Sequence, residues 1–341
     1  MEFKNLSTLA SHIKDARHIV ITTHRHPDGD AIGSSLGLYH VLKKITDRVD
    51  VIVPDNYPSF LKWMTGSDII HIHEHQQNTA DELIKSAELI FSLDYNQLHR
   101  TQAMEKALNQ AKAPKVLVDH HPGPKVSEFD FIYSEEHFSS TAEIVYKLLI
   151  ALELDTYLDK DAATALYAGI LTDTGSFSYS IGRPEVFETA GQLVRLGVEP
   201  EMVSQQIYDT YSESRLRLLG YCLSQRMKVF PEYATAYIYL TREDMERFNY
   251  QDGDAEGLVN YGLSIKGINL SVLLKEKDDV VRMSLRSKEG FAVNTFAREH
   301  FEGGGHQKAA GANSYMSMQD TIKKLEALLP QYKEQLNRIN R

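Results

Sequence analysis

The sequence predicts an α/β protein: an N-terminal domain with a mostly parallel sheet and helices on both faces, followed by a smaller C-terminal α/β domain. Three observations predict this class. In the first half, short β-branched runs alternate with helix-like segments, which is the pattern of βαβ units. From about residue 226 the pattern changes to paired strand-like runs and a glycine-rich stretch. The length of 341 residues suits two domains, at about 100–200 residues per domain.

The strands expected in the N-terminal domain are runs rich in Val and Ile, and we place them at 18–23, 49–54, 88–94 and 115–121. Helix-like segments lie between and after them, at 31–44, 79–87, 100–112, 139–154, 162–176 and 182–197. Two of these segments carry end signals. Ser140 and Glu143 have the spacing of a capping box, and Pro184 and Gly197 stand near the two ends of the last helix.

The C-terminal part follows a mostly helical segment at 199–225, which we interpret as the tail of the first domain or a connector. Antiparallel strands are expected within 226–241, in a hairpin over 272–286 and in the glycine-rich stretch. Helices are expected at 242–265, 290–301 and 319–337.

Charge and cysteine content exclude several classes of protein. The 37 basic and 47 acidic residues give a net charge of −10, which argues against a broad duplex-binding surface. The single cysteine, Cys222, excludes an internal disulfide framework and a multi-cysteine zinc site, and fits a reducing cytoplasm. The N-terminus carries charges throughout and does not look like a signal peptide, and no apolar run reaches the roughly 18 residues of a membrane span.

Four apolar segments each run into residues that commonly ligate metals. In chain order these residues are His24, Asp28 and Asp30, then Asp94, then Asp119, His120 and His121, and finally Asp173. A single Asp at a strand end is usually a turn former or a helix cap. The carboxyl ends of parallel strands meet in one crevice, however, so we expect the whole set to converge there. A site of carboxylates and imidazoles without a thiolate suits manganese, magnesium or a similar divalent ion. Two such ions would need a bridging carboxylate, and together they would activate a water molecule for phosphoryl hydrolysis.

Five motifs resemble those of a known family. THRHPDGDAIGS (23–34), SLDYNQ (92–97), VDHHPG (118–123) and GILTDTGSF (169–177) resemble the four motifs of the DHH phosphoesterase superfamily in order and spacing. EGGGHQKAAG (302–311) resembles the glycine-rich motif of the DHH-associated domain, DHHA1. The resemblance covers nearly the whole chain. It implies a DHH catalytic metal-binding domain over 1–198, a helical connector over 199–225 and a DHHA1 substrate-binding domain over 226–341.

The resemblance also implies roles for individual residues. The protein would bind two divalent ions, with manganese as the first choice. The ligands of the first ion would be His24, Asp28 and Asp94, and those of the second would be Asp30, Asp94, His120 and Asp173, so that Asp94 bridges the two ions. His121 would face the scissile phosphate as a donor, and Asp119 would orient an imidazole. From the chemistry of the residues themselves, we expect the second domain to bind substrate phosphates through Arg286, Gly303, Gly304, Gly305 and His306.

Within the superfamily, the two-domain layout resembles the bifunctional oligoribonucleases that are also phosphatases of 3′-phosphoadenosine-5′-phosphate (pAp). It implies a cytoplasmic, manganese-dependent phosphoesterase that acts as a 3′–5′ exoribonuclease on short RNA and as a nucleotide phosphatase, using a water activated by two metal ions. Expected partners are short RNA or a small phosphorylated nucleotide, with no duplex DNA and no membrane. A homodimer is left open.

Other functions on the same fold remain open at this point. A phosphodiesterase for cyclic di-AMP or its linear product pApA would share all the motifs. An inorganic pyrophosphatase is disfavoured because its Ser-Arg-Lys signature is replaced by LRSK (285–288), and a long single-strand exonuclease would normally carry further domains. A non-catalytic nucleotide-binding sensor would be marked by the loss of a ligand, and all the expected ligands are present.

Overall fold

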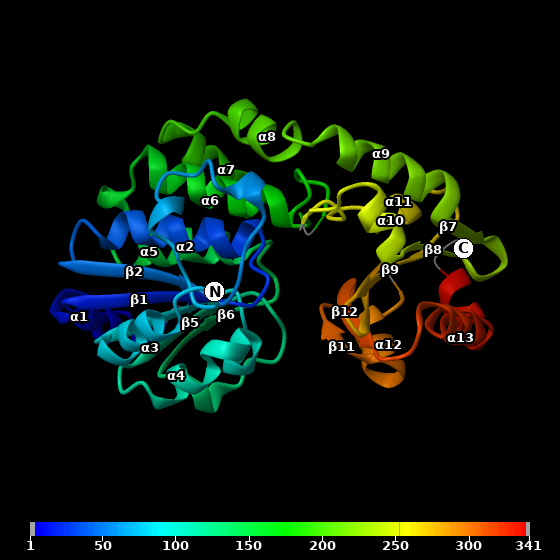
Figure 1. Ribbon diagram of the computed structural model, residues 1–341. Helices are drawn as coiled ribbons and strands as arrows, with labels where there is room; N and C mark the ends of the chain where they lie inside the picture. The colour runs from blue at the N-terminus through cyan, green and yellow to red at the C-terminus, as the bar shows by residue number, and fades with distance from the viewer. Residues whose placement is uncertain (1–3, 180, 252, 289, 339–341) are drawn as a thin grey trace. The chain divides into compact units, whose positions relative to one another are not determined.

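The structure, a computed structural model, describes residues 4–179, 181–251, 253–288 and 290–338 (Figure 1). It divides into two compact units, Met1–Thr210 and Tyr211–Arg341. The division lies inside the predicted connector, between helix α8 (Pro200–Tyr208) and helix α9 (Glu213–Tyr221). The domain boundaries drawn from the sequence, 1–198, 199–225 and 226–341, stay a prediction, and each unit is described by itself below.

The first unit contains a six-stranded sheet in the order β3-β2-β1-β4-β5-β6, and every pair of neighbours is parallel. This confirms the predicted parallel sheet. Because the order reverses between β1 and β4, the crevice beyond the carboxyl ends of these two strands is the place where such folds bind ligands. The strands are β1 (His18–Thr23), β2 (Arg48–Val53), β3 (His71–Ile72), β4 (Leu89–Leu93), β5 (Lys115–Asp119) and β6 (Phe131–Ser134).

Helices cover both faces of this sheet (Figure 1). Along β1, Ile19 and Ile21 join one apolar cluster while Val20 joins the other, as the alternation of side chains along a strand requires. Helices α2, α5, α6 and α7 lie on the first face, and α3 and α4 on the second (Figure 1). The helices are α1 (Leu6–Asp15), α2 (Gly29–Leu42), α3 (Gln77–Ser86), α4 (Glu105–Gln110), α5 (Thr141–Ala151), α6 (Lys160–Asp173), α7 (Pro184–Arg195) and α8.

Helices α2 and α6 pack unusually closely, and glycines make this possible. A Cβ atom on Gly33 would lie 2.5 Å from the carbonyl oxygen of Ala165 and 2.8 Å from the amide nitrogen of Gly169. A Cβ atom on Gly169 would lie 2.9 Å from a carboxylate oxygen of Asp30. This crossing therefore fixes the start of α2 against the end of α6, and each of those ends carries one predicted metal ligand.

The second unit contains a six-stranded mixed sheet in the order β11-β12-β10-β9-β8-β7. The predicted hairpin is confirmed, because β9 and β10 pair antiparallel. The expectation of antiparallel strands throughout is wrong at one place, since β8 and β9 are parallel. A crossover with helices of its own separates these two strands, and a connection of that length permits parallel pairing. The strands are β7 (Met227–Phe230), β8 (Thr235–Leu240), β9 (Leu270–Lys277), β10 (Val280–Ser287), β11 (Glu302–Gly305) and β12 (Ala309–Ser314).

The helices of the second unit are α9, α10 (Arg242–Arg247), α11 (Asn260–Leu263), α12 (Val293–His300) and α13 (Met318–Arg338), with a single π-helical turn at Cys222–Arg226. The continuous helix predicted over 242–265 is wrong. Asn249, Gly253 and Gly257 have positive φ angles of 50°, 100° and 77°, which right-handed helices do not accommodate. Cys222 is a buried free thiol. Among the described residues, no helix is both long and apolar enough to cross a membrane.

Candidate metal centre

The carboxyl ends of β1, β4 and β5 bring the predicted ligands of the first unit together. His24 follows β1, Asp94 follows β4, and Asp119 ends β5. Asp30 and Asp173 come from the first turn of α2 and the last residue of α6. Among the described residues of the first unit, three groups have ligand atoms that all lie within 4.8 Å of one another: His24, Asp28 and Asp94; Asp30, Asp94 and His120; and Asp94, Asp119 and His121.

Asp94 is common to all three groups and has a different neighbour at each oxygen. Its Oδ2 atom lies 3.3 Å from Nε2 of His24, while its Oδ1 atom lies 3.6 Å from Nε2 of His120. The side chain is almost completely buried, and the residue has a φ angle of 66°. Asp is one of the few residue types that tolerate this left-handed conformation. The turn after β4 thus places one carboxylate between two imidazoles.

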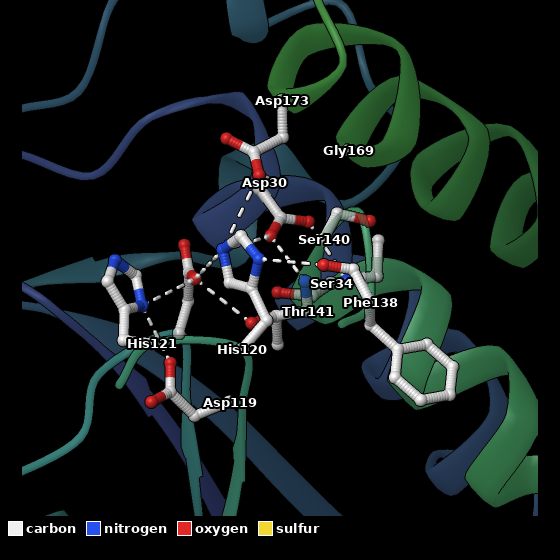
Figure 2. A network of polar contacts seen from close by, with 12 residues as sticks. Asp30, Ser34, Asp119, His120, His121, Phe138, Ser140, Thr141, Gly169 and Asp173 are labelled. Atoms are coloured by element: carbon white, nitrogen blue, oxygen red, sulfur yellow. Dashed lines mark hydrogen bonds and ion pairs between the residues drawn. The ribbon is translucent and has the colours of Figure 1, made fainter. Parts of the chain in front are cut away.

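Backbone carbonyls orient the two imidazoles. Nδ1 of His24 lies 2.8 Å from the carbonyl oxygen of Arg25, and Nδ1 of His120 lies 3.4 Å from that of Phe138. A carbonyl oxygen only accepts, so Nδ1 carries the proton in each ring and Nε2 is the atom left to bind a metal. Figure 2 shows the His120 ring between the Phe138 carbonyl and the Asp173 carboxylate, and its Nε2 lies 3.4 Å from Oδ2 of Asp173.

The pKa values show a centre with a surplus of negative charge. Burial raises the pKa of Asp30, and the charges of Asp94, Asp173 and Asp28 raise it further. Burial raises the pKa of Asp173 to about 6. The charges of Asp28 and Asp94 also raise this pKa, while His120 acts in the opposite direction.

The same charges act on the imidazoles in the opposite sense to burial. Burial lowers the pKa of His24, but the carboxylates of Asp94 and Asp28 outweigh it and raise the value to about 9. Asp173 also stands at the C-terminus of α6, where the helix dipole disfavours an anion. Buried carboxylates and Nε2 atoms that face one another in this way fit divalent cations.

Asp28 caps α2 and also faces His24. Its Oδ1 atom accepts hydrogen bonds from the backbone N–H groups of Asp30 and Ala31, so it is the N-cap of this helix. The same oxygen lies 4.0 Å from Nε2 of His24, and about half of the side chain is exposed. Capping and metal binding are therefore compatible uses of this carboxylate.

Asp119 and His121 form a pair beside the centre. Nδ1 of His121 lies 2.8 Å from Oδ1 of Asp119, and Asp119 is completely buried. The donor to this carboxylate is Nδ1–H, which leaves Nε2 of His121 for another partner.

Sequence reasoning missed a further part of the centre, at the start of α5. The backbone N–H groups of Thr141 and Ala142 donate to the two oxygens of Asp30, at 2.6 and 2.9 Å. The Thr141 hydroxyl donates to Oδ1 of Asp94 at 2.9 Å. The sequence pattern predicts Ser140 as the cap of this helix, and its hydroxyl does accept from the N–H of Glu143. That pattern predicts a helix start, but not which side chains the helix start will contact.

Two of the predicted substrate-binding residues of the second unit, Arg286 and Gly304, lie on one face of its sheet. Arg286 pairs with Ala309 across β10 and β12, and Gly304 pairs with Gly311 across β11 and β12. Directly opposed residues of antiparallel strands, and every second residue along a strand, share a face, so Arg286 and Gly304 are on the same face. Among the described residues, a Cβ atom on Gly304 would meet only Nε of Arg298 within 4 Å, at 3.9 Å. The backbone there is open to approach, and His306 follows β11 directly.

Comparisons with known proteins agree with this fold and site. The model of the DHH family N-terminal domain matches residues 18–170, and that of the DHHA1 domain matches residues 231–337. The bifunctional oligoribonuclease and PAP phosphatase NrnA of Thermus thermophilus is 30% identical over 94% of this chain and 90% of its own length.

Two further comparisons bear on the fold and on the function. The crystal structure of an exopolyphosphatase-related protein from Bacteroides fragilis has a TM-score of 0.93 and 40% identity, with 97% of each chain covered. The cyclic-di-AMP phosphodiesterase GdpP of Bacillus subtilis is 26% identical over 94% of this chain, which spans 49% of that protein.

The fold and the site together define a metal-dependent phosphoesterase. Its first and second domains are matched in turn by the DHH and DHHA1 family models. The chain belongs to the DHH family, with a DHHA1 domain after the DHH domain.

Proposed function

We propose that this chain hydrolyses short oligoribonucleotides and 3′-phosphoadenosine-5′-phosphate with two divalent ions, manganese being the preferred metal. One observation carries the proposal: the Asp94 carboxylate faces His24 through one oxygen and His120 through the other. His24, Asp28 and Asp94 are the proposed ligands of the first ion, and Asp30, Asp94, His120 and Asp173 those of the second. The substrate class is supported by the name and the 30% identity of the Thermus relative.

Divalent cations bound there would supply Lewis acidity, which polarises phosphoryl oxygens and activates water for attack on phosphorus. The protein's own residues hold the reacting groups. Nδ1–H of His121 donates a hydrogen bond to Asp119, so this buried carboxylate orients the ring and would stabilise its charge when Nε2–H also donates to a phosphate. His121 is thus the proposed phosphate donor, and Asp119 its orienting partner.

The second unit supplies the proposed phosphate contacts. The glycine backbone of Gly303, Gly304 and Gly305 allows close approach of an anion, and His306 and Arg286 add side-chain donors. With a net charge of −10, the chain favours a short single-stranded substrate over duplex DNA.

Arg286→Ala is expected to raise KM for pAp by about 10- to 100-fold, because a hydrogen bond to a charged group contributes about 1.5–3 kcal/mol. We expect kcat and the bound manganese to stay unchanged, since the metal ligands belong to the first unit. Steady-state kinetics and metal analysis measure both quantities. Arg242→Ala is the matched control, because Arg242 donates to the Asp278 carbonyl at the turn between β9 and β10, at the opposite end of β10. An unchanged KM, or a loss of manganese, would refute the role given to Arg286.

A hydrolysis panel tests the proposed function as a whole. The purified protein with added Mn²⁺ is given pAp, a pentanucleotide RNA, pApA, cyclic di-AMP and inorganic pyrophosphate in separate reactions. We expect pAp and the pentanucleotide to have the highest kcat/KM, and Mg²⁺ to support slower turnover than Mn²⁺.

The rival functions give different results in the same panel. Cyclic di-AMP or pApA as the best substrate would assign the chain to dinucleotide turnover, the function that the name of the GdpP relative suggests. Binding of nucleotide without any product would indicate a non-catalytic sensor.

A further inference from the structure

Thr141 contacts two proposed metal ligands at once. It is the first residue of α5, it is completely buried, and it lies beside Asp30 in Figure 2. Its backbone N–H donates to Oδ2 of Asp30 at 2.6 Å, and its hydroxyl donates to Oδ1 of Asp94 at 2.9 Å. The two acceptors are 111 and 47 residues away in the chain. A single residue therefore relates a carboxylate from α2 to a carboxylate from the end of β4.

The contacts of Thr141 fall on one side of the centre. The Asp94 oxygen that it binds, Oδ1, is the one that faces His120, whereas Oδ2 faces His24. Asp30 likewise belongs with His120, whose Nε2 lies 4.0 Å from Oδ2 of Asp30. The other side has separate supports, because the Arg25 carbonyl accepts from His24 and Asp28 is anchored as the cap of α2.

We propose that Thr141 is a positioning residue for the second metal ion, the one assigned to Asp30, Asp94, His120 and Asp173. This inference rests on the proposed function, which assigns two ions to the centre. A carboxylate oxygen has two lone pairs, so a donor on one of them fixes the direction in which the other can bind a metal. Thr141 fixes Asp94 with its hydroxyl and, together with the N–H of Ala142, fixes Asp30 with its backbone.

The start of α5 is rigid enough for this task. Ser140 caps the helix, and the buried Glu143 accepts from both the N–H and the hydroxyl of Ser139, at 3.0 and 2.8 Å. The other Glu143 oxygen lies 3.5 Å from Nη2 of Arg183. Nη1 of Arg183 donates to the His137 carbonyl oxygen at 2.9 Å. Hydrogen bonds and an ion pair therefore fix the residues before and after Thr141.

Substitution of Thr141 can separate its side chain from its backbone. Thr141→Val keeps the shape and the backbone N–H but removes the hydroxyl that donates to Asp94. Thr141→Ser keeps the hydroxyl and removes only the methyl group. Thr189→Val is the matched control, because Thr189 is also buried in the first unit and its hydroxyl has no hydrogen-bond partner among the residues that the structure describes.

The test is a titration of metal-stripped protein with Mn²⁺, followed by calorimetry and by the electron paramagnetic resonance signal of free Mn²⁺. For Thr141→Val we expect the affinity for the second equivalent to fall about 10- to 100-fold, the range for loss of a hydrogen bond to a metal ligand. The first equivalent should change much less. Thr141→Ser and Thr189→Val should bind both equivalents as the unchanged protein does, and all four proteins should have the same circular dichroism spectrum.

Three results would overturn the inference. One is wild-type affinity for both equivalents in Thr141→Val. Another is an equal loss at both sites, which would indicate general disruption rather than positioning of one ion. The third is a Thr141→Ser variant as weak as Thr141→Val, which would assign the effect to methyl packing. If the unchanged protein binds fewer than two ions, the two-ion centre of the proposed function fails first, and this inference fails with it.

Discussion

Asp94→Asn is expected to lower kcat/KM for pAp and for short RNA by at least about 10³-fold, or about 4 kcal/mol of transition-state stabilisation. Asn keeps the shape of the side chain but replaces one carboxylate oxygen with an NH₂ group, which cannot bind a metal. Since Asp94 faces His24 through one oxygen and His120 through the other, its loss affects both proposed ions. Bound manganese, measured by elemental analysis after dialysis, should fall as well.

The variant should still fold, so a loss of activity can be assigned to the centre. Asn tolerates the left-handed backbone that Asp94 adopts, with its φ angle of 66°. Asp81→Asn is the matched control. Asp81 lies on α3, its side chain is 40% exposed, and it contacts Nε2 of His73 at 2.9 Å instead of a proposed metal ligand. We expect that control to keep full activity. Retention of more than a tenth of the wild-type kcat/KM by Asp94→Asn would contradict a bridging role.

The local sequence contains most of what is needed to predict the first sheet and its ligands. β1, β4 and β5 are mostly buried strands rich in Val, Ile and Leu, and a run of that kind predicts a strand wherever it lies in the chain. His24, Asp94 and Asp119 stand at or just after the ends of these strands, so their convergence follows from the parallel sheet. Strand β6 was missed because it has only four residues and two of them are half-buried. Such a short edge strand is defined by its pairing with β5 rather than by its own composition.

The contacts that orient the ligands could not be predicted in the same way. Thr141 donates to Asp30 and Asp94 only because the N-terminus of α5 packs at the end of the sheet, next to the crossing of α2 and α6. That packing depends on the volumes of many side chains, and no short sequence pattern encodes it. The helix predicted over 242–265 failed for a related reason, since the backbone turns at Gly253 and Gly257 interrupt an apparently continuous pattern.

Gly33→Ala is the substitution for which we expect the largest loss of stability. The added methyl group would lie 2.5 Å from the Ala165 carbonyl oxygen and 2.9 Å from Cα of Gly169, both of them backbone atoms of α6. Backbone atoms cannot rotate away as a side chain can, so the two helices must separate. Overpacking of this kind costs about 1–3 kcal/mol and sometimes more, and the higher helix propensity of Ala offsets about 1 kcal/mol of it. We expect a net loss of about 2 kcal/mol, which lowers Tm by about 4–8 °C.

The same displacement should weaken metal binding, because two of the proposed ligands, Asp30 and Asp173, lie in the first turn of α2 and at the end of α6. Thermal melting of metal-free protein measures the first effect, and Mn²⁺ titration measures the second. Gly191→Ala is the matched control, because Gly191 lies inside α7 and a Cβ atom there would meet no atom within 4 Å in the part of the chain that the structure describes. At that open position Ala should raise stability by about 0.5–1 kcal/mol, because Gly costs that much more than Ala inside a helix. If Gly33→Ala lowers the free energy of unfolding while Gly191→Ala raises it, close contact between α2 and α6, and not helix propensity, determines the effect at Gly33. An equal gain in stability at both positions would mean that α2 and α6 can move apart at no cost. The α2–α6 crossing would then not be what holds Asp30 and Asp173 in place.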